Sequence, residues 1–123
     1  MKKRRATVIY ENELGILLVP DQRGTFMLPG GHAKRGEARI IAAIRELHEE
    51  TKLNATEIKF LFEFESNHFE HKVFLVKADG IPVPSGELYG QELAYFPIGM
   101  TEIPSEIRIM NSSMKIIQRY LSN

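Results

Sequence analysis

Short apolar runs separated by polar turns recur along the chain, and their β-branched and aromatic content is typical of strands. A polar turn over residues 21–24 separates the second run from the third. Within residues 57–65, phenylalanine or isoleucine returns at every second position, as in a strand with one buried face. The predicted strands are residues 5–10, 14–19, 25–28, 57–65, 71–77 and 93–96.

Helical spacing is found in two segments. The first covers residues 37–51, downstream of Pro29-Gly30-Gly31, which should leave any regular element. The second should begin with a cap at Pro104-Ser105-Glu106 and pack on the sheet through an apolar stripe, with partner binding as the alternative. That stripe is Ile107, Met110, Met114, Ile117 and Leu121. Residues 78–90 are rich in Gly and Pro and predict a loop, so the order of elements favours an α+β fold, a mixed sheet flanked by helices.

The first helix carries three carboxylates. At about 100° per residue, Glu46, Glu49 and Glu50 share an arc of about 100°. Most of the apolar side chains fall on another arc, which predicts that they pack on the sheet and that the acids face away from the core. That apolar arc comprises Ile40, Ile41, Ile44, Leu47, His48 and Thr51. Ala42 and Ala43 then leave room beside the acids for a ligand.

Like charges at this spacing repel unless a cation lies between them, and the helix dipole disfavours acids near the C-terminus. Hard divalent cations such as magnesium prefer carboxylate oxygen. The alternative is a solvated face on which Arg45 pairs with Glu49. Gly30 and Gly31 favour the metal site, because their backbone N–H groups can come close to a ligand.

Composition narrows the class of protein. The 123 residues fit one domain, and 16 basic side chains balance 16 acidic ones, so we expect no nucleic-acid polymer as a partner. No cysteine is present, which excludes disulfides and thiolate metal sites. No run of apolar residues is long enough for a secretory signal or a membrane span, so we expect a cytoplasmic protein without a membrane. The basic N-terminus should be solvated, with a nucleic-acid arm as the alternative.

The segment around the first helix resembles the signature of the Nudix hydrolases. That signature is a glycine, five residues, a glutamate, seven residues, then Arg-Glu-apolar-any-Glu-Glu-any-Gly-apolar. Here Gly31, Glu37 and the run from Arg45 to Leu53 match eight of the nine specified positions. Lys52 stands where the family has glycine; a left-handed lysine there costs roughly 1 kcal/mol, unless Asn54 shifts the helix end. The lead-in Pro-Gly-Gly and the order of elements extend the resemblance over residues 1–123 as a single Nudix hydrolase domain.

The resemblance implies a Nudix fold, an α/β/α sandwich with a loop-helix-loop catalytic signature, in a small MutT-like member. It implies Mg²⁺, with Mn²⁺ as a substitute, bound by Glu46, Glu49 and Glu50 (above all Glu50), with the backbone of Gly30 contributing. Glu46 is also a candidate base for the attacking water. Arg45 should orient a glutamate through a bidentate pair, and Glu37 should act as an outer ligand or a capping acid. Gly30 and Gly31 should cradle metal or phosphate.

The implied reaction is hydrolysis of a phosphoanhydride in a nucleoside diphosphate derivative, with a nucleoside triphosphate going to monophosphate and pyrophosphate. Nucleotide sugars and dinucleoside polyphosphates stay open as substrates, and, since relatives are often monomers or dimers, we expect a monomer or homodimer. The candidate substrate contacts are Phe26, His32, Asn67, His68, Phe69, Tyr95 and Phe96. An additional acid should come from Glu92, Glu87 or Glu70. The competing interpretations are a non-catalytic nucleotide-binding module of the same fold, or an interaction domain whose acidic helix binds a basic partner.

Overall fold

Two β-sheets form the framework of the molecule. The computed structural model describes residues 1–99 and 106–122. The strands are β1 (Lys3–Ile9), β2 (Glu11–Asn12), β3 (Gly15–Pro20), β4 (Phe26–Met27), β5 (Gly30–His32), β6 (Asn54–Glu65), β7 (Phe69–Asp79) and β8 (Ala94–Phe96). The helices are α1 (Arg39–Thr51) and α2 (Asn111–Leu121), with a 3₁₀ turn, η1 (Gly86–Leu88).

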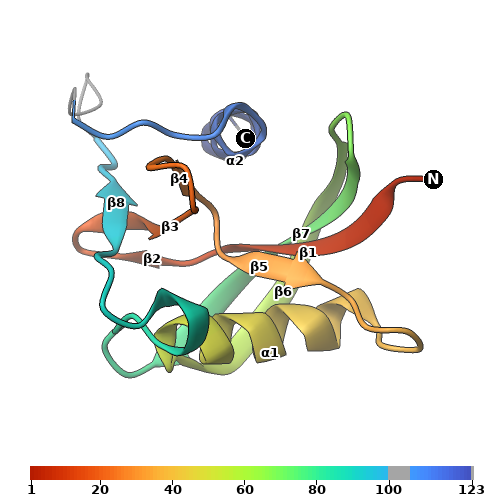
Figure 1. The fold of residues 1–123 in the computed structure, drawn as a ribbon, viewed down its shortest axis with the longest axis horizontal. Coiled ribbons are helices and arrows are strands. Elements are labelled where there is room, and N and C mark those ends of the chain that lie inside the picture. Colours follow the sequence, from red (N-terminus) through yellow and green to blue (C-terminus); the bar gives the residue numbers. More distant parts are fainter. Residues whose placement is uncertain (100–105, 123) are drawn as a thin grey trace.

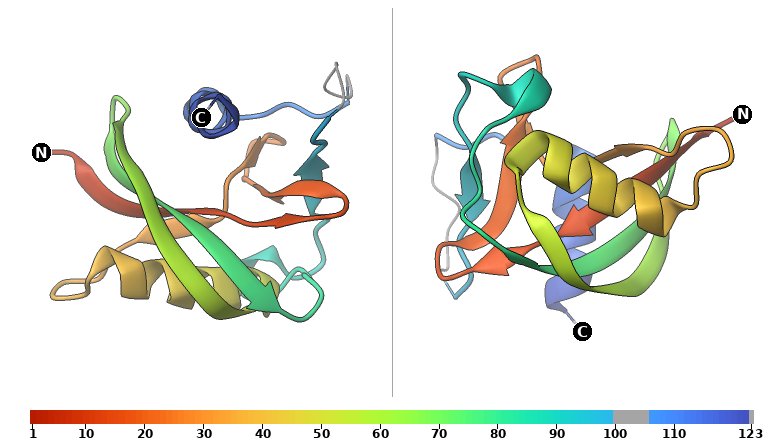
Figure 2. Two further views of the ribbon diagram at one scale, coloured as in Figure 1. Left: turned by 180° about the vertical axis from the view of Figure 1, so that it is seen from behind. Right: turned by 90° about the horizontal axis from the view of Figure 1, so that it is seen from below.

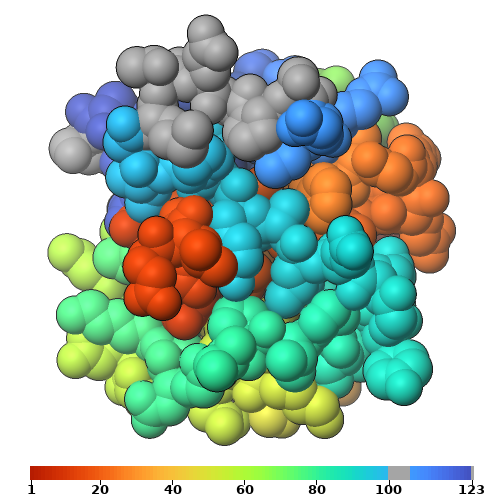
Figure 3. Space-filling view, turned by 90° about the vertical axis from the view of Figure 1, so that its left-hand side faces the viewer, coloured from red at the N-terminus to blue at the C-terminus, as the bar shows by residue number. Residues whose placement is uncertain are grey.

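The larger sheet has the strand order β5-β1-β7-β6, with β1 and β7 parallel and the other pairs antiparallel. This confirms the mixed sheet that the sequence predicts. The smaller sheet is antiparallel, with β3 between β2 and β4 along its path and β8 also paired with β3. Figure 3 shows the chain from η1 to β8 running across one face of the molecule beside the β2–β3 turn.

The helices lie on opposite faces of the larger sheet (Figures 1 and 2). Alternation along β1 explains how one sheet supports both helices, because successive side chains point to opposite faces. Ala6 and Val8 belong to the core beneath α1, and Ile9 belongs to the core beneath α2. Both cores are closed: each of these three side chains is 0% exposed.

The C-terminal helix begins later than the sequence predicts. The expected cap at Pro104-Ser105 lies outside the described residues, and α2 starts only at Asn111. Before it, the N–H of Phe26 donates to the carbonyl of Arg108 at 2.7 Å, and the N–H of Met110 donates to the carbonyl of Phe26 at 2.8 Å. These bonds hold the backbone of residues 108–110 extended beside β4, so the helical prediction for residues 107–110 is wrong.

Two other boundaries also differ from the prediction. Gly30 and Gly31, expected to be irregular, are paired with β1 in strand β5. Strands β6 and β7 are longer than predicted, and β6 starts at Asn54, immediately after the helix–strand connection. Among the described residues, no helix has the length and apolar content needed to cross a membrane.

Candidate active site

Helix α1 packs through a face that overlaps only in part with the predicted one: Leu47 and Thr51 are buried as expected. Ala42, Ala43 and Leu47 are 0% exposed, whereas Ile40 is 39% and Ile41 is 53% exposed. The buried face is therefore rotated toward the acidic arc. The prediction that the acids face away from the core is wrong for Glu46 and Glu50, while Glu49 is exposed as expected. The two alanines leave no free space for a ligand. They allow the helix axis to approach β1 and β5 closely, because each carries only one methyl group.

Glu46 lies directly against strand β5, and a glycine makes this possible. A Cβ atom added to Gly31 would lie 2.4 Å from the Cδ atom of Glu46 and 2.6 and 2.7 Å from its two carboxyl oxygens. The absent side chain of Gly31 is thus the space that the Glu46 carboxylate fills. Burial raises the pKa of Glu46, against the lowering effect of Arg45.

Glu50, one turn later, is anchored to the same strand. The backbone N–H of Gly30 donates to Oε1 of Glu50 at 3.0 Å. Burial raises the pKa of Glu50 to about 7, although this hydrogen bond and the nearby Arg5 act in the opposite direction. A partly buried carboxylate with one hydrogen bond, close to a second carboxylate, is stabilised by a cation.

Arg45 ties together the outer acids of α1. Its Nε and Nη2 atoms donate to the two carboxyl oxygens of Glu37 at 2.8 and 2.9 Å, which is the bidentate pair that we expect from the sequence. Nη1 donates to Glu46 at 2.9 Å and to Glu49 at 3.2 Å. The Arg45 guanidinium lowers the pKa of Glu37 to about 2, and the Glu37 carboxylate in turn raises the pKa of Arg45. Arg45 therefore sets where three of the four signature acids lie.

Helix α1 stops where the family signature has its glycine. Lys52 adopts the left-handed conformation, with φ 65° and ψ 2°, and its N–H donates to the carbonyl of His48. Among the described residues it is the one non-glycine with positive φ. The alternative of a stop shifted to Asn54 is thus wrong, and the strain falls on Lys52 itself.

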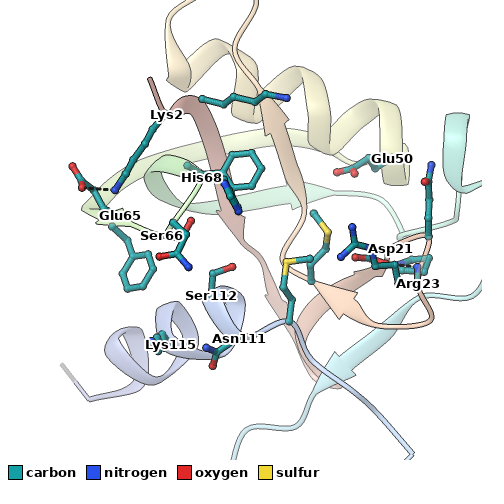
Figure 4. Close-up of a pocket in the computed structure, with 18 of the residues that line it drawn as sticks. Lys2, Asp21, Arg23, Glu50, Glu65, Ser66, His68, Asn111, Ser112 and Lys115 are labelled. Atoms are coloured by element: carbon teal, nitrogen blue, oxygen red, sulfur yellow. Dashed lines mark hydrogen bonds and ion pairs between the residues drawn. The ribbon is translucent and has the colours of Figure 1, made fainter.

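A large cavity of about 1420 Å³ opens between the larger sheet and α2, with Glu50 in its wall. Figure 4 shows Glu50 near Asp21 and Arg23 at one end, and Lys2, Ser66 and His68 toward the other. The start of α2 provides another side. Residues that line the cavity from this side are Met110, Asn111, Ser112 and Lys115.

The predicted substrate contacts divide into two groups. Asn67, His68 and Phe69 line the cavity, and His32 packs beside Phe69 with 5.4 Å between ring centroids and 38° between the ring planes. The other three pack against the cores instead: Phe26, Tyr95 and Phe96. The cavity-lining residues at the start of α2 were not among the predicted substrate contacts. The sequence placed the start of this helix at Pro104-Ser105-Glu106, whereas it begins at Asn111 beside the cavity.

Of the three candidate additional acids, Glu87 is the one that lines the cavity together with Glu50. It lies in η1, which is fixed to the end of α1 because the N–H of Ser85 donates to the carbonyl of Glu50 at 2.9 Å. Glu92 and Glu70 do not line the cavity.

The donor set suits a hard divalent cation. Glu46 and Glu50 offer carboxylate oxygens whose charged forms are disfavoured by burial until a cation arrives. Within residues 1–99 and 106–122, no three acidic or histidine side chains are arranged to hold a metal on their own. Magnesium does not need such a cage, since it usually takes one or two carboxylates and fills its shell with water and phosphate oxygens.

Comparison with protein families agrees with this geometry. The NUDIX domain family model matches residues 1–103. The chain belongs to the Nudix family. A comparison with curated protein sequences found no match.

Solved structures place the Nudix chain among its relatives. A Nudix hydrolase family member from Chromobacterium violaceum is 34% identical, with a TM-score of 0.86 over 99% of this chain and 78% of that one. MutT, studied from Aliivibrio salmonicida and Vibrio cholerae, is 22% identical, with a TM-score of 0.78 over 98% and 97% of the two chains. A bifunctional NMN adenylyltransferase/ADP ribose pyrophosphatase from Francisella tularensis is 20% identical, with a TM-score of 0.74 over 100% of this chain and 41% of that one. The latter two likenesses show the fold. Family membership supports a hydrolase that acts on pyrophosphate bonds of nucleotide derivatives.

Proposed function

We propose that the protein is a magnesium-dependent hydrolase of a nucleoside diphosphate derivative, which converts a nucleoside triphosphate to monophosphate and pyrophosphate. One observation carries the proposal: the Glu50 carboxylate, held by the Gly30 N–H at 3.0 Å, forms part of the wall of a cavity that can hold a nucleotide. A metal site that opens into such a cavity brings cation and phosphates together.

Glu46 and Glu50 are the residues that would hold the metal, with Glu49 and the Gly30 backbone as further ligands. A cation held there would neutralise the diphosphate and lower the pKa of a coordinated water. Arg45 keeps Glu46 and Glu49 in place through hydrogen bonds of 2.9 and 3.2 Å. Glu46 takes the proton of the attacking water, whose oxygen forms the new bond to phosphorus while the bridging oxygen leaves with the second phosphate group. Glu87, which lines the same cavity as Glu50, is the additional acid that we propose would help to hold the metal.

The size of the cavity favours a second class of substrate. Pockets for small molecules typically measure about 300–1,000 Å³, and this cavity measures about 1420 Å³. The excess volume would admit a second sugar or a second nucleoside. Nucleotide sugars and dinucleoside polyphosphates are therefore the alternative substrates.

A nucleotide panel with Mg²⁺ tests the proposal. Nucleoside triphosphates, nucleotide sugars and dinucleoside polyphosphates are incubated with the protein, and release of pyrophosphate, orthophosphate and nucleoside monophosphate is followed. We expect Glu50→Gln to lose at least about 100-fold in kcat, as for removal of a group that acts in the transition state. Glu13→Gln changes an exposed glutamate in the β2–β3 turn and should retain full activity.

The outcomes separate the alternatives. Nucleotide binding without turnover on any compound would favour the non-catalytic module. Release of pyrophosphate with equal activity in Glu50→Gln would contradict the metal assignment and leave the hydrolase in place. A cytoplasmic location and a monomeric or homodimeric state stay predictions.

A further inference from the structure

Arg5 is a buried charge that the Nudix signature does not include. It lies in β1, opposite His32 of β5 and His71 of β7, on the face of the sheet that α2 covers. The residue is 8% exposed. Taking a guanidinium out of water is costly unless opposite charge or several hydrogen bonds replace the water.

The direct partner of Arg5 belongs to the segment that holds Glu50. Nη2 of Arg5 donates to the carbonyl of Leu28 at 3.0 Å. Two residues later, the N–H of Gly30 donates to the Glu50 carboxylate. Arg5 thus supports, from beneath, the stretch of backbone on which Glu50 rests.

The opposite charge comes from the catalytic acids, without a direct ion pair. In the part of the chain that the structure describes, no carboxylate forms a salt bridge with Arg5. Glu50 and then Glu46 are nevertheless close enough to raise the pKa of Arg5, against the larger lowering effect of burial. An arginine stays charged at neutral pH even so. The guanidinium is therefore a fixed positive charge behind both carboxylates.

We propose that Arg5 is a positioning residue whose fixed charge balances Glu46 and Glu50 in the free protein and opposes the binding of a divalent cation until the phosphates of the substrate arrive. The inference rests on the proposed function. Arg5 and a cation at Glu50 are attracted to the same carboxylates and repel each other. An anionic substrate relieves that repulsion, so metal and nucleotide bind cooperatively.

Two variants separate the charge from the hydrogen bond. Arg5→Gln removes the charge and keeps an N–H donor for the Leu28 carbonyl. Arg5→Lys keeps the charge and loses the planar fork. Mn²⁺ binding to the protein without nucleotide is measured from the electron paramagnetic resonance signal of free Mn²⁺ at pH 8. Tm is measured in parallel.

We expect Arg5→Gln to bind Mn²⁺ about tenfold more tightly than the wild type, the size of a screened repulsion between a divalent ion and one charge in the same site. Arg5→Lys should bind Mn²⁺ as the wild type does. The nucleotide should then increase Mn²⁺ affinity less in Arg5→Gln than in the wild type.

Equal Mn²⁺ affinity in all three proteins would overturn the proposal. So would weaker binding in both variants that follows their loss of Tm, because Arg5 would then be structural. Failure of Mn²⁺ to bind even to Arg5→Gln would also overturn it. The nucleotide panel on the wild type decides separately whether the hydrolase function stands.

Discussion

Replacing Gly31 by alanine isolates the contact between β5 and Glu46. The backbone at Gly31 does not have positive φ, so alanine fits the strand conformation. The added Cβ would lie 2.4–2.7 Å from the Glu46 carboxyl group. Carbon atoms normally stay about 3.5 Å or more from such neighbours, so the carboxyl group must move by about 1 Å.

The displaced group is the flexible end of a side chain, which limits the effect on stability. The lost Arg45–Glu46 hydrogen bond is worth about 0.5 kcal/mol at this exposure, and a Gly→Ala change in a compatible strand returns a similar amount. Tm should therefore stay within about 3 °C of the wild type. A misplacement of about 1 Å in the machinery costs about 100-fold in kcat, or about 2.7 kcal/mol of barrier.

The assay measures kcat on the best nucleotide of the panel, together with thermal unfolding. Gly80→Ala is the control, because Gly80 has φ 106° and an added Cβ there would meet only Leu53 within 4 Å and none of the acids. It should lose stability and keep its activity. Wild-type kcat in Gly31→Ala would refute the reasoning that Glu46 must lie against β5. Gly30→Ala should fail for another reason, since its Cβ would lie 2.0 Å from the backbone oxygen of Ala6.

Three further changes test other parts of the site. Lys52→Gly should raise stability by about 0.5–1 kcal/mol by removing left-handed strain, and an equal gain in Lys52→Ala on chemical denaturation would contradict this. Arg45→Lys should lower kcat about tenfold, because lysine cannot form the bidentate hydrogen bond to Glu37. Unchanged kinetics would show that this bidentate pair is not needed for activity. Burial, with Arg5 second, lowers the pKa of His71 to about 4. A histidine in the unfolded chain has a pKa near 6.5. The contribution of neutral His71 to the free energy of unfolding is therefore fully present above about pH 6.5 and is lost as the pH falls to about 4. The loss is about 2 kcal/mol after allowance for solvent screening. His71→Gln should flatten this part of the stability–pH curve, and an unchanged slope would assign the loss to other groups.

The sequence predicted the signature helix well because its information is local. The spacing from Gly31 to Leu53 defines which residues share a turn, and α1 ends at Thr51 as predicted. The orientation of the helix was predicted only in part: Leu47 and Thr51 are buried as expected, but the whole apolar stripe was assumed to be the buried face. Close packing on a glycine-containing strand instead selected Ala42 and Ala43, and left Ile40 and Ile41 exposed.

The cavity depends on contacts that no local pattern contains. Phe26 and Met110 are far apart in the sequence, yet their backbone hydrogen bond delays the start of α2 and turns Asn111 toward the cavity. The helical periodicity of Ile107 and Met110 is real and was overridden by this pairing. Arg5 was likewise predicted to belong to a solvated basic N-terminus. Pairing of β1 with β5 and β7 instead buries it.

The arrangement of α1 against β5 explains why the signature joins glycines to acids. Carboxylates on the buried side of a helix are disfavoured by desolvation, and the pKa of Glu50 rises to about 7 for this reason. The glycine strand admits them because it offers space at Gly31 and an N–H donor at Gly30. The result is a pair of acids fixed in position whose negative charge is only partly balanced. In the proposed function, such a pair would bind a cation more tightly than solvated acids, since little side-chain entropy would be lost and the surroundings favour neutralisation.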